Sequence, residues 1–364
     1  MAASVTICRR SSQIRATRQN HLEDNFFPSG PLLYIDSTLP LPEKALIRRI
    51  RREARLPAKF NRGRTNVGVA IGDDCAIVRL PPGHEALVTT DFSLEGIHFR
   101  RDWHSPQVVG HRCLARGLSD VAAMGGEPLA AFLSLALPPK LPQRWVDLFL
   151  KGLLTLARDF GINLAGGDTA ESPDGILADI VVLGSVPKGR AILRSGARPG
   201  DRVYVTGELG GAAAAIERLV ASPNKKLPPR DFPRHFRPMP RIEVGRVLRQ
   251  RSLASAMIDI SDGLSTDLAH LCDESGVGAE LRKASIPRAR VGRTRRAVKL
   301  DLALHGGEDY ELLFTARGKK IPGSIAGVPI HLIGEIKSGK HVLLVDQRGA
   351  ARELIPRGWE HLKP

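Results

Sequence analysis

Apolar residues recur with a helical period in some stretches of the chain and form short runs typical of strands in others. In residues 43–55 they place Leu46, Ile47 and Ile50 on one face, which predicts an amphipathic helix. The first half then predicts a strand over 86–90, a helix over 106–124, a strand over 129–137, a helix over 143–160 and a strand over 176–186. We expect the helix over 143–160 to stop at Gly161, because glycine readily adopts the left-handed conformation that closes a helix.

The second half repeats this mixture after a stretch of turn-forming residues at 187–200. The expected elements are a strand over 202–206, a helix over 210–220, a Pro- and Arg-rich loop over 222–240, a helix from Arg241, a strand over 256–260 that leads into a helix, and strands over 310–315, 329–336 and 341–346. The alternation predicts a mixed α/β, or α+β, fold. We expect an N-terminal extension over 1–42, a first domain over 43–190 and a second domain over 191–364.

Length and composition agree with this organisation. The chain has 364 residues, more than the ~100–200 residues of one typical core. No stretch approaches the ~18 apolar residues of a membrane span, so we predict a soluble protein. The four cysteines form no CxxC pair, which disfavours a zinc or dithiol site and favours a cytoplasmic location. Residues 1–20 are rich in Arg and Ser without a secretory signal; a transit peptide, a disordered extension or an over-long start all fit, and we prefer the extension.

The formal net charge of +16 raises nucleic-acid binding as a hypothesis. Residues 1–64 hold 13 Lys/Arg against 5 acidic residues, and residues 282–299 hold eight basic residues and no acidic ones. Neither run is interleaved with aromatic residues that stack on bases, and no helix-turn-helix or RNA-binding motif accompanies them. We interpret both as solvated surface and expect no nucleic-acid or membrane partner. The sequence assigns no function to 282–299.

Candidate chemistry is concentrated in aspartates that lie beside Gly, Ser or Thr. The segments are GDDCAIV with Asp73 and Asp74, TTDFSLEGIHF with Asp91, LSDVAAMGGEP with Asp120, GGDT with Asp168, and IDISDG with Asp259 and Asp262. We expect them in turns at strand ends, where ligands bind in such folds, although one motif alone is equally typical of a simple turn or helix cap. If several carboxylates converge, their repulsion requires cations, and oxygen ligands favour Mg²⁺ held together with phosphates.

The order of these motifs, continued by LRSGARPGD, YVTGELG, IDISDGLSTDL and GGEDYELLF, resembles the thiamine-monophosphate kinase family. The wider superfamily includes aminoimidazole ribonucleotide synthetase and selenophosphate synthetase. The resemblance implies the two-domain aminoimidazole ribonucleotide synthetase-like fold, an N-terminal domain that pairs in a homodimer, and ATP bound in a nearby cleft. It also implies binding without a Walker A loop, and the sequence contains no GxxxxGK[ST].

The resemblance further implies roles for residues in the matching motifs. The implied metal ligands are Asp74, Thr89, Thr90, Asp91, Asp120, Asp168, Asp259 and Asp262, of which Asp91, Asp120 and Asp259 are the expected catalytic residues. The implied ATP contacts are Gly167, Asp168, Arg194 and Ser261, and the implied substrate contacts are His98, Glu308 and Trp359. Carboxylate and threonine oxygens suit Mg²⁺, and a planar guanidinium suits phosphate. We interpret Asp73 as structural, and Glu308 is also compatible with shaping the turn before the strand at 310–315.

The implied activity is the Mg²⁺- and ATP-dependent phosphorylation of thiamine monophosphate to thiamine diphosphate, with several Mg²⁺ ions and direct in-line transfer. Transfer between two anions needs charge neutralisation and alignment more than a strong base. One alternative is another ATP-using enzyme of the superfamily, of the ribonucleotide cyclo-ligase or selenophosphate synthetase type. The absence of a reactive Cys in a Gly-rich N-terminal loop disfavours the selenophosphate synthetase type. The other is a basic RNA-binding or scaffold protein without catalysis, which the intact aspartate motifs disfavour.

Overall fold

The computed structural model of the chain describes residues 41–54, 66–223, 226–318 and 320–359. The predicted N-terminal extension therefore lies outside the described residues except for its last two positions. All described residues belong to one compact unit, and the boundary predicted between residues 190 and 191 stays a prediction. Across the described ranges, we find no helix that combines the length and apolarity needed to cross a bilayer.

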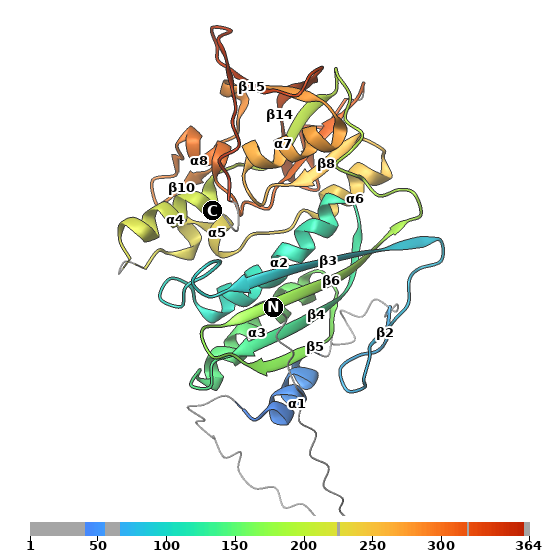
Figure 1. The fold of residues 1–364 in the computed structure, drawn as a ribbon, viewed down its shortest axis with the longest axis vertical. Coiled ribbons are helices and arrows are strands. Elements are labelled where there is room, and N and C mark those ends of the chain that lie inside the picture. Colours follow the sequence, from blue (N-terminus) through green and yellow to red (C-terminus); the bar gives the residue numbers. More distant parts are fainter. Residues whose placement is uncertain (1–40, 55–65, 224–225, 319, 360–364) are drawn as a thin grey trace, which may run out of the picture. The chain divides into compact units, whose positions relative to one another are not determined.

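A four-stranded sheet and two long helices make up the first half of the described chain (Figure 1). The strand order is β3 (His84–Leu94), β6 (Leu177–Pro187), β4 (Glu127–Leu137) and β5 (Asn163–Glu171), with β4 and β5 parallel and the other pairs antiparallel. Helices α2 (Pro106–Ala123) and α3 (Gln143–Asp159) cover one face of this sheet. Helix α1 (Glu43–Glu53) and the ribbon of β1 (Val67–Val69) and β2 (Ile77–Val78) lie beside β5.

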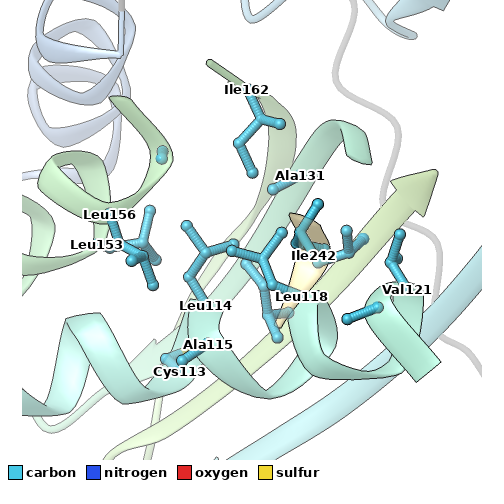
Figure 2. Close-up of a cluster of buried hydrophobic side chains, with 14 of the residues drawn as sticks. Cys113, Leu114, Ala115, Leu118, Val121, Ala131, Leu153, Leu156, Ile162 and Ile242 are labelled. Atoms are coloured by element: carbon cyan, nitrogen blue, oxygen red, sulfur yellow. The ribbon is translucent and has the colours of Figure 1, made fainter. Parts of the chain in front are cut away.

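The core between the helices and this sheet consists of apolar side chains at helical spacing. Figure 2 shows Leu114 of α2 beside Leu156 of α3, with Ile242 from the second half of the chain in the same cluster. The two helices pack closely, because a Cβ at Gly152 would lie 2.0 Å from the carbonyl oxygen of Gln107. Burial contributes about 1.5–3 kcal/mol for each large apolar side chain. This core therefore fixes α2 against the sheet and against the second half of the chain.

Side chains along the edge strand β3 alternate between the two faces of the sheet. Thr89 and Asp91 lie on the face that α2 covers. Val88 and Phe92 lie on the opposite face, where 69% and 56% of their surface is exposed. Strand β3 thus presents the carboxylate of Asp91 on one face of the sheet and exposed apolar side chains on the other.

The second half is built on an eight-stranded sheet with the order β16–β15–β9–β14–β7–β12–β8, in which β13 also pairs with β14. The strands are β7 (Arg202–Thr206), β8 (Ala256–Asp259), β9 (Gly278–Arg282), β12 (Leu312–Ala316), β13 (Ser324–Ile325), β14 (Val328–Lys337), β15 (Val342–Val345) and β16 (Ala351–Glu353). The helices are α4 (Gly211–Ala221), α5 (Pro233–Phe236), α6 (Ile242–Gln250), α7 (Leu264–Ser275) and α8 (Leu300–His305). Edge strand β8 and helix α6 both contact α2, so the two halves meet along that helix.

Most of the predicted elements are confirmed with small shifts at their ends, including α2, α3 and β7, and Gly161 has the expected positive φ of 65°. Strand β5 was not predicted, because GGDT was interpreted as a turn. The expectation that the aspartates lie in turns is wrong for three of them: Asp91 lies inside β3, Asp120 inside α2 and Asp168 inside β5. Polar neighbours or solvent satisfy each carboxylate there, so the backbone can remain regular.

Candidate active site

Three carboxylates from three different elements meet where the two halves of the chain join. Asp91 comes from β3, Asp120 from the last turns of α2 and Asp259 from the end of β8. Asp91 and Asp120 are hydrogen-bonded to each other, and the hydroxyl of Thr89 donates a short hydrogen bond to Asp120. Asp259 is 4% exposed and accepts a 2.7 Å hydrogen bond from Ser119 Oγ. The packing of α2 against both sheets therefore assembles this carboxylate cluster.

The carboxylate cluster carries more negative charge than its surroundings can stabilise. Burial, and then the charge of Asp120, raises the pKa of Asp91 to about 7 and that of Asp259 to about 8. Burial also raises the pKa of Asp120. Arg116 lowers the pKa of Asp91, and Arg194 lowers those of Asp120 and Asp259, but neither charge reverses the shift. Such a cluster is suited to bind divalent cations, which would compensate the charge.

The carboxylate cluster opens into a cleft of about 760 Å³. Its lining includes most of the residues to which the sequence assigned roles: Thr90, Asp91, His98, Asp120, Asp259, Ser261, Asp262, Glu308 and Trp359. The volume lies within the ~300–1,000 Å³ range of small-molecule sites. The structure therefore brings the predicted catalytic residues and all three predicted substrate contacts into one cleft.

The wall that carries His98 and Trp359 is held by backbone hydrogen bonds. The Leu94 N–H donates to His98 Nδ1 at 3.0 Å, so a neutral His98 carries its proton on Nε2 and can donate from that atom. The Trp359 N–H donates to the carbonyl oxygen of Asp262 at 3.3 Å, which seats the C-terminal segment over the start of α7. Asp262 also lies close enough to Asp267 and His270 for the three to share one cation.

Glu308 is fixed by two arginines from the opposite side of the cleft. It has a positive φ of 65°, and its carboxylate accepts hydrogen bonds at 2.7–2.8 Å from Arg112 and at 2.7 Å from Arg116. Both arginines are nearly buried, with exposed fractions of 3% and 8%. Burial alone would raise the pKa of Glu308, but the charges of Arg112 and then Arg116 outweigh it and lower the pKa. The contacts of both arginines with Glu308 therefore connect α2 to the loop before β12.

A pair of buried histidines extends this contact toward α5. Arg112 donates to the carbonyl oxygen of His235 at 2.6 Å and lies 3.1 Å from its Nδ1. Because Arg112 is a donor only, Nδ1 of His235 accepts and its Nε2–H faces His104 Nε2 at 2.8 Å. Burial lowers the pKa of both rings, to about 4 for His104, so the pair is neutral at pH 7. A continuous buried hydrogen-bond chain thus supports the Glu308 side of the cleft.

The remaining predicted residues do not join the carboxylate cluster. Asp74, Gly167 and Asp168 line a second cavity of about 550 Å³ near β5 and α1. Asp168 is three strands away from β3, about 14 Å across the sheet. Gly167 has a φ of 145°, and a Cβ there would lie 1.8 Å from the Leu133 carbonyl oxygen, so this position requires glycine. Arg194 lines neither cavity but acts on the cluster through its charge.

Two arginines of α2 that bind Glu308 were not among the predicted site residues, although their spacing in the sequence indicates a shared face. Arg112, Arg116 and Asp120 are the Asp, Glu, Lys or Arg residues of α2 and recur every four residues, which places all three on one helical face. That face is the one that borders the cleft. Asp179 was also missed; it accepts a 2.7 Å hydrogen bond from Thr90 and stands in the same cross-strand row as Asp168.

Two protein-family models match the chain and cover most of it. The AIR synthase related protein N-terminal domain matches residues 72–186, and the AIR synthase related protein C-terminal domain matches residues 198–346. The first match contains Asp91 and Asp120, and the second contains Asp259 and Glu308. The predicted two-domain fold of this superfamily is thereby confirmed.

Individual relatives narrow the similarity to one family. Thiamine-monophosphate kinase from Salmonella typhimurium is 37% identical over 320 residues, which cover 85% of this chain and 96% of that protein. Thiamine-monophosphate kinase from Bacillus subtilis is 34% identical and covers 82% of this chain and 95% of its own length. Both matches extend over almost the whole of the related protein.

Solved structures give the same result. The crystal structure of thiamine-monophosphate kinase from Stenotrophomonas maltophilia K279a has a TM-score of 0.71 at 33% identity, covering 82% of this chain and 95% of that one. The structure of AaThiL complexed with AMPPCP and TMP has a TM-score of 0.68 at 29% identity, covering 88% and 97%. The hydrogenase maturation protein HypE in complex with ATP has a TM-score of 0.69 at 17% identity, a likeness of fold alone.

Proposed function

This chain belongs to the thiamine-monophosphate kinase family, and we propose that it transfers the γ-phosphoryl group of ATP to thiamine monophosphate, forming thiamine diphosphate. The observation that supports this most strongly is the carboxylate cluster of Asp91, Asp120 and Asp259 at the floor of a cleft large enough for a small phosphorylated molecule. The related structure of AaThiL complexed with AMPPCP and TMP supports the same pair of ligands. We also propose a cytoplasmic location, on the cysteine pattern of the sequence.

Mg²⁺ fits the donor set of the cleft. Burial and the neighbouring carboxylates raise the pKa values of Asp91 and Asp259, so a bound cation would stabilise the charged forms of the cluster. We propose that Asp91, Asp120 and Asp259 hold Mg²⁺, with Thr89 and Asp262 beside them as further oxygen donors. The hydroxyl of Thr90 donates to Asp179 on the opposite face of β3, so its role as a ligand stays a prediction. When bound, Mg²⁺ would supply neutralisation of phosphate charge. The roles of Asp74 and Asp168 as ligands stay a prediction, since both line the second cavity.

The walls of the cleft offer contacts for the acceptor. Nε2–H of His98 can donate to a phosphate oxygen, because Nδ1 already accepts from the backbone. Trp359, 54% exposed, presents an aromatic surface on which a cationic thiazolium or a pyrimidine ring can stack. We propose that Glu308 shapes the pocket rather than binding the cationic ring by charge, because Arg112 and Arg116 already neutralise it.

The nucleotide contacts remain proposals carried by the family motifs. Ser261 lines the cleft, Arg194 directs its charge at Asp120 and Asp259, and Gly167 with Asp168 lines the second cavity. The acceptor phosphate is largely ionised at pH 7, its second pKa being about 6. The cleft must therefore align two anions and offset their repulsion, and we propose direct in-line transfer.

The test of this function is product formation by the full-length chain. We expect ATP, Mg²⁺ and thiamine monophosphate to yield ADP and thiamine diphosphate in equal amounts, measured by a coupled ADP assay and by chromatography of the thiamine esters. Omission of Mg²⁺ should abolish the reaction. Release of ADP with an unrelated ribonucleotide but not with thiamine monophosphate would refute the kinase proposal and leave the fold assignment intact.

We propose that the first halves of two chains pair in a homodimer through the open face of the four-stranded sheet. Val88 and Phe92 are exposed there, and Phe132, Val181 and Leu183 are half-buried on the same face. An exposed apolar surface beside the edge strand β3 favours contact with the same surface of a second chain. In a two-fold symmetric dimer, this contact would bury the open sheet face of both chains.

Light scattering at micromolar concentration should give twice the chain mass for the full-length protein. Val88→Glu, which places a charge on the open face outside the cleft, should shift the protein toward the monomer mass. Val220→Glu is the matched control: Val220 is 60% exposed on α4, away from this sheet, and the variant should stay dimeric. A monomeric and fully active wild-type chain would rule out the proposed dimer.

A further inference from the structure

A further polar cavity is distinct from the cleft and from the second cavity near β5, and it shares no lining residue with either. It has a volume of about 260 Å³, and five of its lining residues are arginines: Arg234, Arg237, Arg241, Arg290 and Arg295. Arg234 and Arg237 belong to the segment predicted as a Pro- and Arg-rich loop, and Arg241 directly precedes α6. The other two belong to the basic run 282–299, to which neither the sequence nor the proposed function gives a role. Two basic segments that are far apart in the chain therefore converge on one cavity, which we call the arginine pocket.

A buried carboxylate behind the lining of the arginine pocket holds two of its arginines. Glu311 is fully buried and accepts hydrogen bonds from Arg241 at 2.6 and 2.7 Å, from Thr206 Oγ1 at 2.5 Å and from Arg234. The Arg234 and Arg241 side chains are only 22% and 18% exposed. Their guanidinium groups are thus held in place before any ligand arrives, which lowers the entropic cost of binding one.

The other side of the arginine pocket is a hairpin anchored beside α5. Strands β10 (Arg290–Val291) and β11 (Arg296–Ala297) pair, and the Gly292 N–H donates to the Asp231 carbonyl oxygen at 3.0 Å. Val291 packs on the cluster that contains Phe232 and Phe236. The hairpin therefore holds its arginines at the rim rather than extending freely into solvent.

The arginine pocket has an excess of positive charge. In the described part of the chain, no carboxylate lies within salt-bridge distance of Arg237, Arg290 or Arg295. Two acidic residues also line the cavity: Asp309 accepts from the backbone N–H groups of Gly210 and Ala212, and Glu208 accepts from the Arg290 N–H. With Glu311, three carboxylates face five arginines, so the arginines remain in excess.

The size of the cavity limits the ligand. A volume of about 260 Å³ is below the range of whole small-molecule pockets, which begins near 300 Å³, so it suits a compact anionic group. Planar guanidinium forks match the oxygens of phosphate in geometry as well as charge. We propose that the arginine pocket binds the phosphate or diphosphate group of a small anion, at a site distinct from the cleft. This inference does not depend on the reaction that the cleft performs.

The test is isothermal titration of the full-length chain with inorganic pyrophosphate, at low salt and with a metal chelator, so that metal-dependent binding in the cleft is absent. The double variant Arg237→Gln/Arg295→Gln should weaken binding by at least about ten-fold, since two charge-assisted contacts are lost. The control Arg293→Gln/Arg296→Gln also removes two positive charges, in this case from hairpin residues outside the pocket lining. It should change the affinity for pyrophosphate by less than about two-fold.

Each other outcome has a definite meaning. Equal losses in both double variants would show attraction to a basic surface only and would overturn the proposal, as would wild-type binding in Arg237→Gln/Arg295→Gln or no binding at millimolar pyrophosphate. Loss of binding in His98→Gln would place the anion in the cleft and would also overturn it. Titration with inorganic phosphate and with ribose 5-phosphate then identifies the source: similar affinities mean that the anionic group alone is recognised, and tighter binding of the ester means an organic phosphate.

Discussion

Asp91→Asn and Asp259→Asn are each expected to lower turnover of ATP with thiamine monophosphate by at least about 100-fold at saturating Mg²⁺, the usual scale for loss of one group that stabilises transition-state charge. Each change removes one negative charge from the cleft floor while keeping the shape of the side chain. The cluster then binds Mg²⁺ less well, and the charge that develops during transfer is less well offset. Steady-state kinetics over a Mg²⁺ titration measures the effect.

The matched control is Asp73→Asn, which removes a charge of the same kind outside the cleft. Asp73 is interpreted as structural and lies outside the cleft, where it accepts a hydrogen bond from the Asp74 N–H at 2.9 Å, so its variant should retain most of the activity. If Asp91→Asn or Asp259→Asn kept more than about a tenth of wild-type turnover at saturating Mg²⁺, its proposed role as a ligand would be wrong.

The thermal stability of Asp259→Asn should distinguish a functional carboxylate cluster from a structural one. The pKa of Asp259 is raised from an ordinary value of 3.8 to about 8, so between these values the folded chain holds a proton that the unfolded chain has lost. Without bound metal, the stabilisation that this proton gives to the folded chain is complete below pH 4 and is lost as the pH rises toward 8. Asp259→Asn should therefore melt at a higher temperature than wild type at pH 8 in chelator, although it is inactive.

The sequence predicted regular elements better than the place of the carboxylates within them. Strand β7 and helices α2 and α3 follow from apolar periodicity, because burial of one face dictates that period. The predicted helix over 106–124 contains Asp120, but the convergence of Asp91, Asp120 and Asp259 does not follow from local pattern. It depends on β8, which brings Asp259 to α2 from some 140 residues further along the chain. Only tertiary packing makes a polar residue acceptable inside such an element.

The Arg112–Glu308 contact also could not be predicted from the local sequence pattern. Arg112 is 196 residues away from Glu308 in the sequence, and no periodic signal links them. The motif resemblance indicated Glu308 as a residue near the substrate, but it gave no sign that two arginines already neutralise its charge. The two arginine contacts therefore favour the alternative that Glu308 shapes the pocket, and its role as a substrate contact stays a prediction.

Acceptor choice is expected to have the other large effect. Free thiamine should be phosphorylated with a kcat/KM at least about 10³-fold below that of thiamine monophosphate, because its neutral hydroxyl requires a general base, a contribution of ~10²–10⁴, and lacks the phosphate that the cleft grips. His98 does not offer that base, because the lone pair of its Nδ1 already accepts a hydrogen bond from the Leu94 N–H. Competition assays with both acceptors at equal concentration measure this ratio.

Trp359→Ala separates recognition of the ring from recognition of the phosphate. Stacking lies far from the reacting phosphorus and should help the ground state and the transition state alike, so this variant should raise KM for thiamine monophosphate more than it lowers kcat. Because free thiamine has the same ring system, the preference for the monophosphate should survive in the variant. His98→Gln should instead reduce the ratio of kcat/KM between thiamine monophosphate and thiamine, since it removes a hydrogen-bond donor that only the phosphorylated acceptor can use. Equal rates for thiamine and thiamine monophosphate in the wild-type chain would overturn the proposed acceptor and, with it, the assignment of the cleft as a phosphate-phosphorylating site.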